Sequence, residues 1–219
     1  AAGALLLLAA ASGWSTTIMR SLLLDHSADV EVMSERGWSP LMLAVASRDT
    51  EMVDLLLEQS ADVDAKGAGR GYTALMIAAA TNQASVAQQF IARRALVDSV
   101  ARSDGKTALL IAVEKHYFDI ASMLLASSAQ VDVQRSDGKT ALMLVCEDGG
   151  TFSGAENLIK DVLAKKASVN MRCTADSSAI ELAAHARWWP AVELLARAGA
   201  EQVGTGQGQQ SVLIAAVAA

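Results

Sequence analysis

The chain has 219 residues, of which 52% are hydrophobic and only 4% aromatic, so its apolar content is mainly Ala and aliphatic side chains. A formal net charge of −6 argues against nucleic acid as the main partner, because phosphate binding requires clustered Lys and Arg. Two cysteines, Cys146 and Cys173, are too few for a disulfide framework or a zinc site. We therefore expect Cys146 to be a small core residue in a protein of the cytoplasm or another reducing compartment.

An apolar segment stands near the start of the chain. Residues 4–11 include four leucines, and no basic residue precedes them. The segment is well short of the ~20 apolar residues that a membrane-spanning helix needs. It therefore predicts a helix that packs inside the fold, and we expect no insertion into a membrane.

A single module recurs along the rest of the chain. Each copy begins with a small hydroxyl residue, followed two places on by Leu or Ile, then by a pair of small residues and a paired apolar run. The copies begin at Ser39, Thr73, Thr107, Thr140, Ser178 and Ser211, which lie 34, 34, 33, 38 and 33 residues apart. A fixed period in this range is typical of a solenoid, in which each unit buries its apolar face only against its neighbours. The pattern favours a recognition surface over an enzyme with a closed pocket.

The copy that begins at Thr107 indicates how each module folds. Asp-Gly at residues 104–105 favours a turn, and Thr107 is suited to cap the start of a helix. The apolar residues within 109–113 then share one helical face, and those within 120–125 predict a second helix. Because the connectors are short, the two helices should be antiparallel.

These motifs resemble the ankyrin repeat, whose pattern runs D-x-x-G-x-T-P-L-H-x-A-A, then V-x-x-L-L, then G-A-x-V-N. The matching stretches include residues 37–45 with 61–64, residues 71–79 with 95–98, and residues 137–142 with 167–170. The resemblance implies an all-α ankyrin-repeat solenoid of stacked helix-turn-helix units joined by short hairpin-like turns.

The resemblance covers nearly the whole chain as one solenoid of about seven units. The predicted units are 1–33, 34–67, 68–101, 102–134, 135–172, 173–205 and 206–219. The first and last units are incomplete and the chain begins without Met, which predicts an excerpt from a longer repeat protein. The spacing breaks near residues 14–17 and again at the Gly-rich residues 149–154, which we expect to form a mobile lobe.

The chain departs from the family pattern at the His of each unit. The replacements are Met42, Met76, Leu110, Met143, Glu181 and Ile214. Mostly apolar contacts should therefore replace the hydrogen bonds that this His makes in the family. The Pro of the pattern survives only as Pro40, at a position that favours a helix start.

Two sequence features could suggest chemistry, but each has a simpler interpretation. Gly-Lys-Thr at residues 105–107 and 138–140 resembles the end of a phosphate-binding loop, yet Val100 and Val133 replace the glycine that such a loop needs. The three histidines have no partner at a metal-ligand spacing. We expect no enzyme activity and no catalytic, cofactor or metal site, although a triad assembled from distant residues remains an alternative.

The resemblance implies that partners contact the hairpin tips and the concave face of the first helices. The residues immediately before the helix caps are Trp38, Tyr72, Lys106 and Lys139, their hairpin neighbours include Arg36, Arg70, Asp104 and Asp137, and the first helices end with Glu114, Lys115, Glu147 and Asp148. Aromatic and Arg side chains dominate interface hot spots. Trp38 and Tyr72 with Arg36 and Arg70 therefore predict an aromatic–basic patch. The alternative is that both rings only cover neighbouring hairpins.

A second aromatic pair, Trp188-Trp189, precedes Pro190 at an expected helix start. We expect one of these rings to pack in the stack and leave the other available to a partner.

The predicted function is a protein–protein interaction scaffold or adaptor in the cytoplasm, with no cofactor and with a protein partner whose identity the sequence does not reveal. One alternative is the recruiting or regulatory arm of a larger enzyme of the kinase or ligase type. Another is a structural component of a large cytoskeletal assembly.

Overall fold

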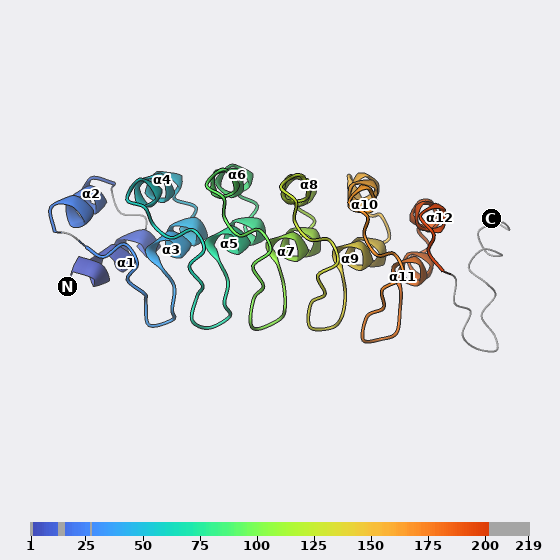
Figure 1. Ribbon diagram of the computed structural model, residues 1–219. Helices are drawn as coiled ribbons and strands as arrows, with labels where there is room; N and C mark the ends of the chain where they lie inside the picture. The colour runs from blue at the N-terminus through green and yellow to red at the C-terminus, as the bar shows by residue number, and fades with distance from the viewer. Residues whose placement is uncertain (1, 13–15, 27, 202–219) are drawn as a thin grey trace. The chain divides into compact units, whose positions relative to one another are not determined.

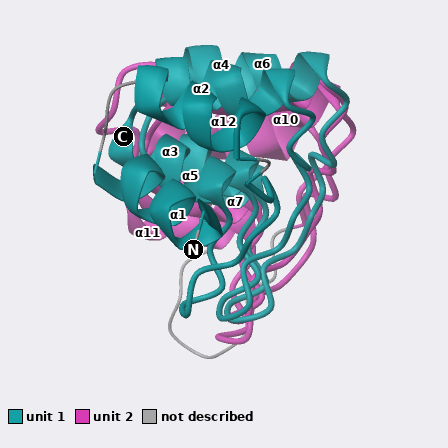
Figure 2. Cartoon of the chain, turned by 90° about the vertical axis from the view of Figure 1, so that its left-hand side faces the viewer, with its two compact units in different colours: residues 1–111 teal, residues 112–219 magenta. Residues whose placement is uncertain are grey.

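The computed structural model describes residues 2–12, 16–26 and 28–201, and within these ranges the chain forms twelve α-helices and no strand. The chain divides into two compact units, Ala1–Ile111 and Ala112–Ala219 (Figure 2). The division falls inside one helix, α7 (Ala108–Glu114).

Unit 1 is built from helix pairs joined by long hairpin-like loops (Figure 1). Its helices before α7 are α1 (Ala2–Ser12), α2 (Thr16–Leu24), α3 (Pro40–Ser47), α4 (Thr50–Glu58), α5 (Ala74–Ala80) and α6 (Ala84–Ala92). The first helix of each pair packs against the first helix of the next, α1 on α3 and α3 on α5, and each also packs on its own second helix.

Unit 2 continues the same alternation. Its helices after α7 are α8 (Phe118–Ala126), α9 (Ala141–Glu147), α10 (Ala155–Ala164), α11 (Ala179–His185) and α12 (Trp189–Arg197). Helix α9 packs on α11, and α10 packs on both α8 and α12. Unit 2 is therefore also a stack of two helical layers, and the expectation of two helices per module is confirmed for the modules that the structure describes.

The hydroxyl residue at the head of each described module acts as the predicted helix cap. The side-chain oxygens of Ser39, Thr73, Thr107 and Thr140 accept hydrogen bonds from the backbone N–H three residues on, at 3.3–3.4 Å. Ser178 uses a different contact, in which its own N–H donates to the carboxylate of Glu181 at 2.8 Å. These bonds satisfy amides that the first turn of a helix would otherwise leave without a partner. Ser211 lies outside the described residues.

Glycine fixes the tip of four hairpin-like loops, and Asp176 takes the same left-handed conformation in the loop before α11. Gly37, Gly71, Gly105 and Gly138 have φ between 69° and 76°, a left-handed conformation that strains residues with a Cβ. The hairpins are then linked through their backbones: Ala68 N–H donates to Gly37 O at 3.0 Å, and Arg102 N–H donates to Arg70 O at 2.9 Å. The Asp-Gly turn prediction is confirmed, and it explains Gly-Lys-Thr without a phosphate-binding loop.

The core consists of aliphatic and small side chains. Leu6 of α1 is fully buried, so the apolar segment near the start of the chain is a packed helix, as predicted. Met42, Met76 and Met143 are buried where the family pattern has His, which confirms that apolar contacts take that place. Cys146 is also buried in the core, and burial raises the pKa of its thiol.

The Gly-rich residues 149–154 connect α9 to α10 and make close contacts inside unit 2. The ring of Phe152 stacks on His116 with centroids 3.6 Å apart. A Cβ on Gly150 would lie 2.3 Å from Cε2 of Trp188, so only glycine fits beside this indole. Whether the segment moves in solution stays a prediction.

The aromatic pair at the start of α12 differs from the expectation. Pro190 lies in the first turn of α12, as predicted. Trp188 and Trp189 are both half-buried, however, because each helix in a stack covers part of the turn beside it.

Candidate functional site

The hairpin before α3 holds Trp38 in a defined position. The backbone N–H of Trp38 donates to Ser34 Oγ at 2.9 Å, and its carbonyl accepts from Ser34 N–H at 2.9 Å. Gly37 makes the turn before it, and the cap at Ser39 begins α3 directly after it. The indole, which is half-buried, therefore stands at the start of α3 on a short, hydrogen-bonded loop.

Tyr72 occupies the equivalent position one repeat later, before α5. Its hydroxyl donates to Asp104 Oδ2 at 3.0 Å, so this ring is tied to the next hairpin. Burial and the contact with Asp104 raise the pKa of Tyr72. Burial alone would raise the pKa of Asp104, but bonds from the Tyr72 hydroxyl and the Lys106 N–H outweigh it and lower that pKa.

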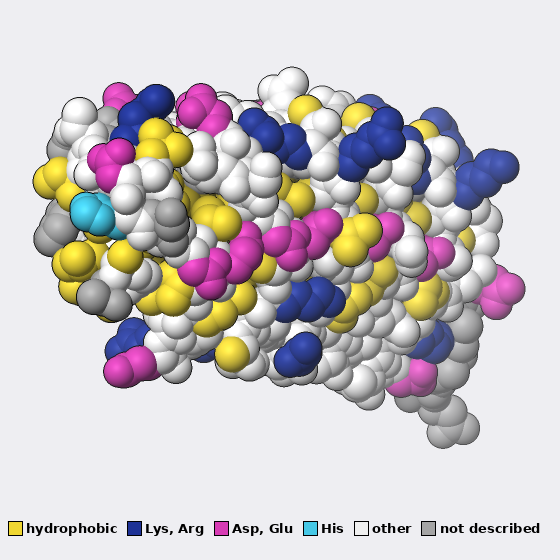
Figure 3. All heavy atoms as spheres, turned by 60° about the vertical axis from the view of Figure 1, so that its left-hand side comes forward, with side chains coloured by type: hydrophobic (Ala, Val, Ile, Leu, Met, Phe, Trp, Pro, Cys, Tyr) yellow, Lys and Arg dark blue, Asp and Glu magenta, His cyan; other side chains and the backbone are white. Residues whose placement is uncertain are grey.

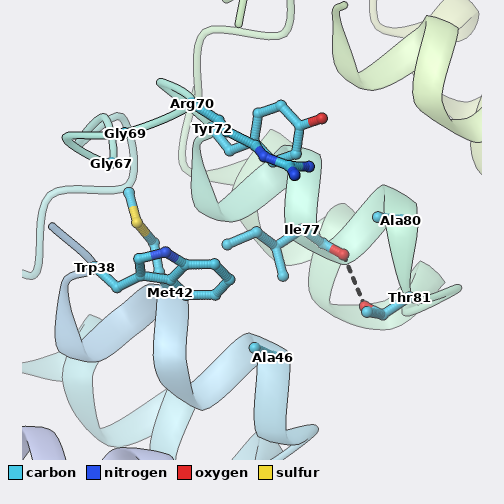
Figure 4. A pocket seen from close by; sticks show the side chains of 10 residues that line it. All are labelled: Trp38, Met42, Ala46, Gly67, Gly69, Arg70, Tyr72, Ile77, Ala80 and Thr81. Carbon is cyan, nitrogen blue, oxygen red and sulfur yellow. Dashed lines mark hydrogen bonds between the residues drawn. The ribbon is translucent and has the colours of Figure 1, made fainter. Parts of the chain in front are cut away.

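The space between these two hairpins is an apolar groove of about 390 Å³, here called the Trp38–Tyr72 groove. Its lining residues are Trp38, Met42, Ala46, Gly67, Gly69, Arg70, Tyr72, Ile77, Ala80 and Thr81. Figure 4 shows Trp38 on one side and Tyr72 with Arg70 on the other, with Ile77 between them. The groove thus has an apolar floor from α3 and α5 and an aromatic wall from each hairpin.

A second groove of about 540 Å³ lies on the other side of Trp38 and is here called the Leu8–Trp38 groove. It is lined by Ala4, Leu7, Leu8, Ala11, Ser34, Glu35, Arg36, Trp38 and Leu43. Leu43 is 34 positions before Ile77 and holds the same place in its groove. Trp38 therefore separates two apolar grooves that are related by the repeat, and Leu8 leaves 56% of its surface exposed at the edge of one.

The structure brings the predicted aromatic–basic patch together only in part. Trp38, Tyr72 and Arg70 share one groove, whereas Arg36 borders the other groove with Glu35. Both arginines are exposed. Lys106 lies 3.6 Å from Asp104 through its ammonium group, so this pair forms an ion pair within the hairpin beside Tyr72. Whether these residues bind a partner stays a prediction.

Most of the predicted site residues of unit 2 contact other polar side chains of the same unit, two of which, Arg135 and His116, were not among the predicted residues. Arg135 donates to both oxygens of Asp137 at 2.7 Å and lies 3.5 Å from Glu114. Lys139 donates to Glu147 at 2.6 Å. In addition, His116 Nδ1 lies 3.2 Å from Asp148 Oδ2, whereas Lys115 is exposed. The charges of Arg135 and Lys139 are thus matched by carboxylates inside unit 2, an arrangement that the sequence does not predict.

The Arg135–Asp137 pair predicts a pH-dependent stability. The guanidinium holds the pKa of Asp137 at about 2, below its ordinary value of 3.8. Because this pKa is lowered on folding, the pair stabilises the fold above pH 4 and loses that effect as the pH falls towards 2. We expect Asp137→Asn to cost about 1 kcal/mol at pH 6, a modest figure because the carboxylate is partly exposed, and almost nothing at pH 2.

Urea unfolding of both proteins at pH 6 and pH 2 measures this difference. Asp54→Asn on α4, an exposed position, serves as the control and should change little at either pH. A loss of the same size at both pH values for Asp137→Asn would refute the assignment.

Sequence reasoning missed the floor of the Trp38–Tyr72 groove. The sequence predicts Met42 only as an apolar replacement of the family's His, and it does not single out Ala46, Ile77 or Ala80. The signal that could have found them is the repeat itself, because Ala46 and Ala80 are 34 positions apart and both line the groove. The small side chains of Ala46 and Ala80 leave space for the groove next to α3 and α5.

The part of the chain that the structure describes has neither a cluster of metal-ligating side chains nor a membrane-spanning helix. Among those residues, no group of three or more His, Cys, Asp or Glu side chains is placed to hold a metal ion. In the same ranges, none of the helices has the length and apolar character needed to cross a bilayer.

Comparisons with known proteins agree with this architecture. A family model described as ankyrin repeats (3 copies) matches residues 3–67 and 65–135, together more than half of the chain. The crystal structure of an ankyrin repeat domain from Acinetobacter baumannii AYE is similar, with a TM-score of 0.80 and 24% identity over 90% of this chain and 98% of that one. No curated protein matches. The predicted all-α repeat solenoid is therefore confirmed.

Proposed function

The chain belongs to the ankyrin repeat family, and on that premise we propose that unit 1 binds a partner protein through the two grooves on either side of Trp38. Ankyrin repeats are in general protein–protein interaction modules. The observation that carries the proposal is the place of Trp38, a half-buried indole that forms a wall of both grooves.

The chemistry of the grooves supports this role. The grooves are open and lined mainly by apolar side chains, so filling them with a partner's side chains would remove the exposed part of that apolar surface from water, at about 25 cal/mol per Å². Trp, Tyr and Arg are the residues that most often dominate binding energy at interfaces, and the Trp38–Tyr72 groove contains one of each. Unit 2 supplies ion pairs at the corresponding positions, which already satisfy one another.

An affinity capture experiment tests the proposal. The wild-type chain and the double variant Trp38→Ala, Tyr72→Ala are immobilised and exposed to an extract of cells that express the chain. We expect the double variant to recover the captured protein at least tenfold less well. Loss of about 1.4 kcal/mol of binding energy suffices for this change.

The matched control is Phe152→Ala, which removes a partly exposed aromatic ring from unit 2. This variant should recover the partner as the wild type does. Equal recovery by the double variant would rule out the grooves as the binding site. A recruiting arm of an enzyme or a part of a cytoskeletal assembly would need a contact of the same kind, and the identity of the captured protein distinguishes them.

A further inference from the structure

The charge in the lining of the Trp38–Tyr72 groove is positive. Arg70 is the one charged residue that lines it, and its side chain lies beside Tyr72 at the hairpin end (Figure 4). At the other end, the guanidinium of Arg48 donates to the carbonyl of Thr81, which is itself a lining residue. The apolar groove therefore has the guanidinium of Arg70 near one end and that of Arg48 near the other, beside Thr81.

The hairpins of unit 1 also carry more cationic than acidic side chains. Residues 34–38, 66–72 and 100–106 carry five cationic and two acidic side chains, Arg36, Lys66, Arg70, Arg102 and Lys106 against Glu35 and Asp104. Asp104 is held by the Tyr72 hydroxyl and by Lys106, which reduces its effect on a ligand. The whole chain has a net charge of −6, so this cationic surface is a local exception.

Two acidic side chains of unit 1 form hydrogen bonds away from the groove. In the connectors that follow the second helices, Glu31 accepts a hydrogen bond from Asp62 N–H and Asp64 accepts one from Leu96 N–H. Figure 3 shows acidic side chains gathered in a row on one face, with Lys and Arg side chains to either side of it. The carboxylates of Glu31 and Asp64 thus stabilise the connectors, and Arg70 is the charged residue of the groove lining.

We propose that the Trp38–Tyr72 groove binds an acidic segment of the partner protein, with apolar side chains in the groove and Asp or Glu beside Arg70 and Arg48. This inference rests on the function proposed above. Apolar side chains cover Trp38 and Ile77, and a carboxylate can accept two parallel bonds from a guanidinium. A nucleic acid fits less well, because the lining offers one cation and otherwise apolar or neutral surface.

Selection from a random dodecapeptide library displayed on phage provides the probe. Peptides are selected on the wild-type chain after removal of those that bind the Trp38→Ala, Tyr72→Ala variant. We expect the retained peptides to be enriched in Asp and Glu next to large apolar residues. Retention of neutral or basic peptides, or of none, would overturn the inference.

Charge reversal then tests the role of Arg70 with the most enriched peptide and with the captured protein. Arg70→Glu should weaken both complexes at least tenfold, and raising the salt concentration should weaken the wild-type complexes. Arg94→Glu, at an exposed position after α6, is the control and should leave both affinities within about twofold. Unchanged affinity in Arg70→Glu would refute the acidic ligand.

The two proposals fail in different ways. If Trp38→Ala, Tyr72→Ala abolishes capture while Arg70→Glu does not, the grooves bind a partner that is not acidic, and only the present inference is wrong. If neither variant changes capture, the proposed function is wrong as well.

Discussion

Gly37→Ala is expected to lower the free energy of unfolding by about 3 kcal/mol, because the new Cβ is strained and has no space. Gly37 has a φ of +69°, and a Cβ built there would lie 2.1 Å from the Cβ of Ala68 and 2.6 Å from its backbone nitrogen. The clash would separate the first two hairpins of unit 1 and break the bond from Ala68 N–H to Gly37 O. Because the clash involves the backbone of Ala68, rotation of a side chain cannot relieve it.

The matched control lies in the next hairpin. A Cβ on Gly69 would meet nothing within 4 Å, so Gly69→Ala should be neutral or stabilising by up to about 1 kcal/mol through a less flexible unfolded chain. Urea unfolding followed by circular dichroism measures both variants. Equal stability of the two would show that the hairpins are not packed as described.

Phe90→Ala is expected to cost about 4 kcal/mol, because it removes a large buried ring and leaves a cavity that the helices cannot fill. Phe90 is 0% exposed in α6. It stands where the neighbouring copies have Leu56 and Leu124, 34 positions away on either side, and both of these are also 0% exposed. The same position of the repeat therefore fills the space between the two helical layers.

Phe152→Ala is the control for ring removal. Phe152 is 43% exposed and stacks on His116, so its loss should cost less than about 1.5 kcal/mol. Thermal and urea unfolding compare the two variants with the wild type. A larger loss from Phe152→Ala than from Phe90→Ala would contradict the assignment of Phe90 to the core.

The elements of the fold were predictable because each depends on local chemistry that the sequence repeats. A hydroxyl at Thr73 caps a helix through an amide three residues away, and the glycine two places earlier takes the positive φ that the hairpin requires. Both are short-range effects, visible in one copy and reinforced by the next. Met42 and Met76 likewise follow from the register that makes those positions buried.

The grooves and the ion pairs could not be predicted in the same way, because they depend on the lengths and directions of side chains from different repeats. The register placed Lys106, Lys139, Trp38 and Tyr72 at equivalent positions. The structure shows that Lys139 contacts Glu147, whereas Trp38 lines two grooves. Equivalent backbone positions thus acquire different roles from their neighbours, which a single sequence does not specify.

Photo-crosslinking tests most directly whether the Trp38–Tyr72 groove binds the partner. Benzoylphenylalanine is introduced in place of Gly69, which lines the groove in open space, or in place of Ala92, an exposed residue at the end of α6. Irradiation of each complex with the captured protein should give a crosslinked product from position 69 and little or none from position 92. A product from position 92 alone would contradict the account.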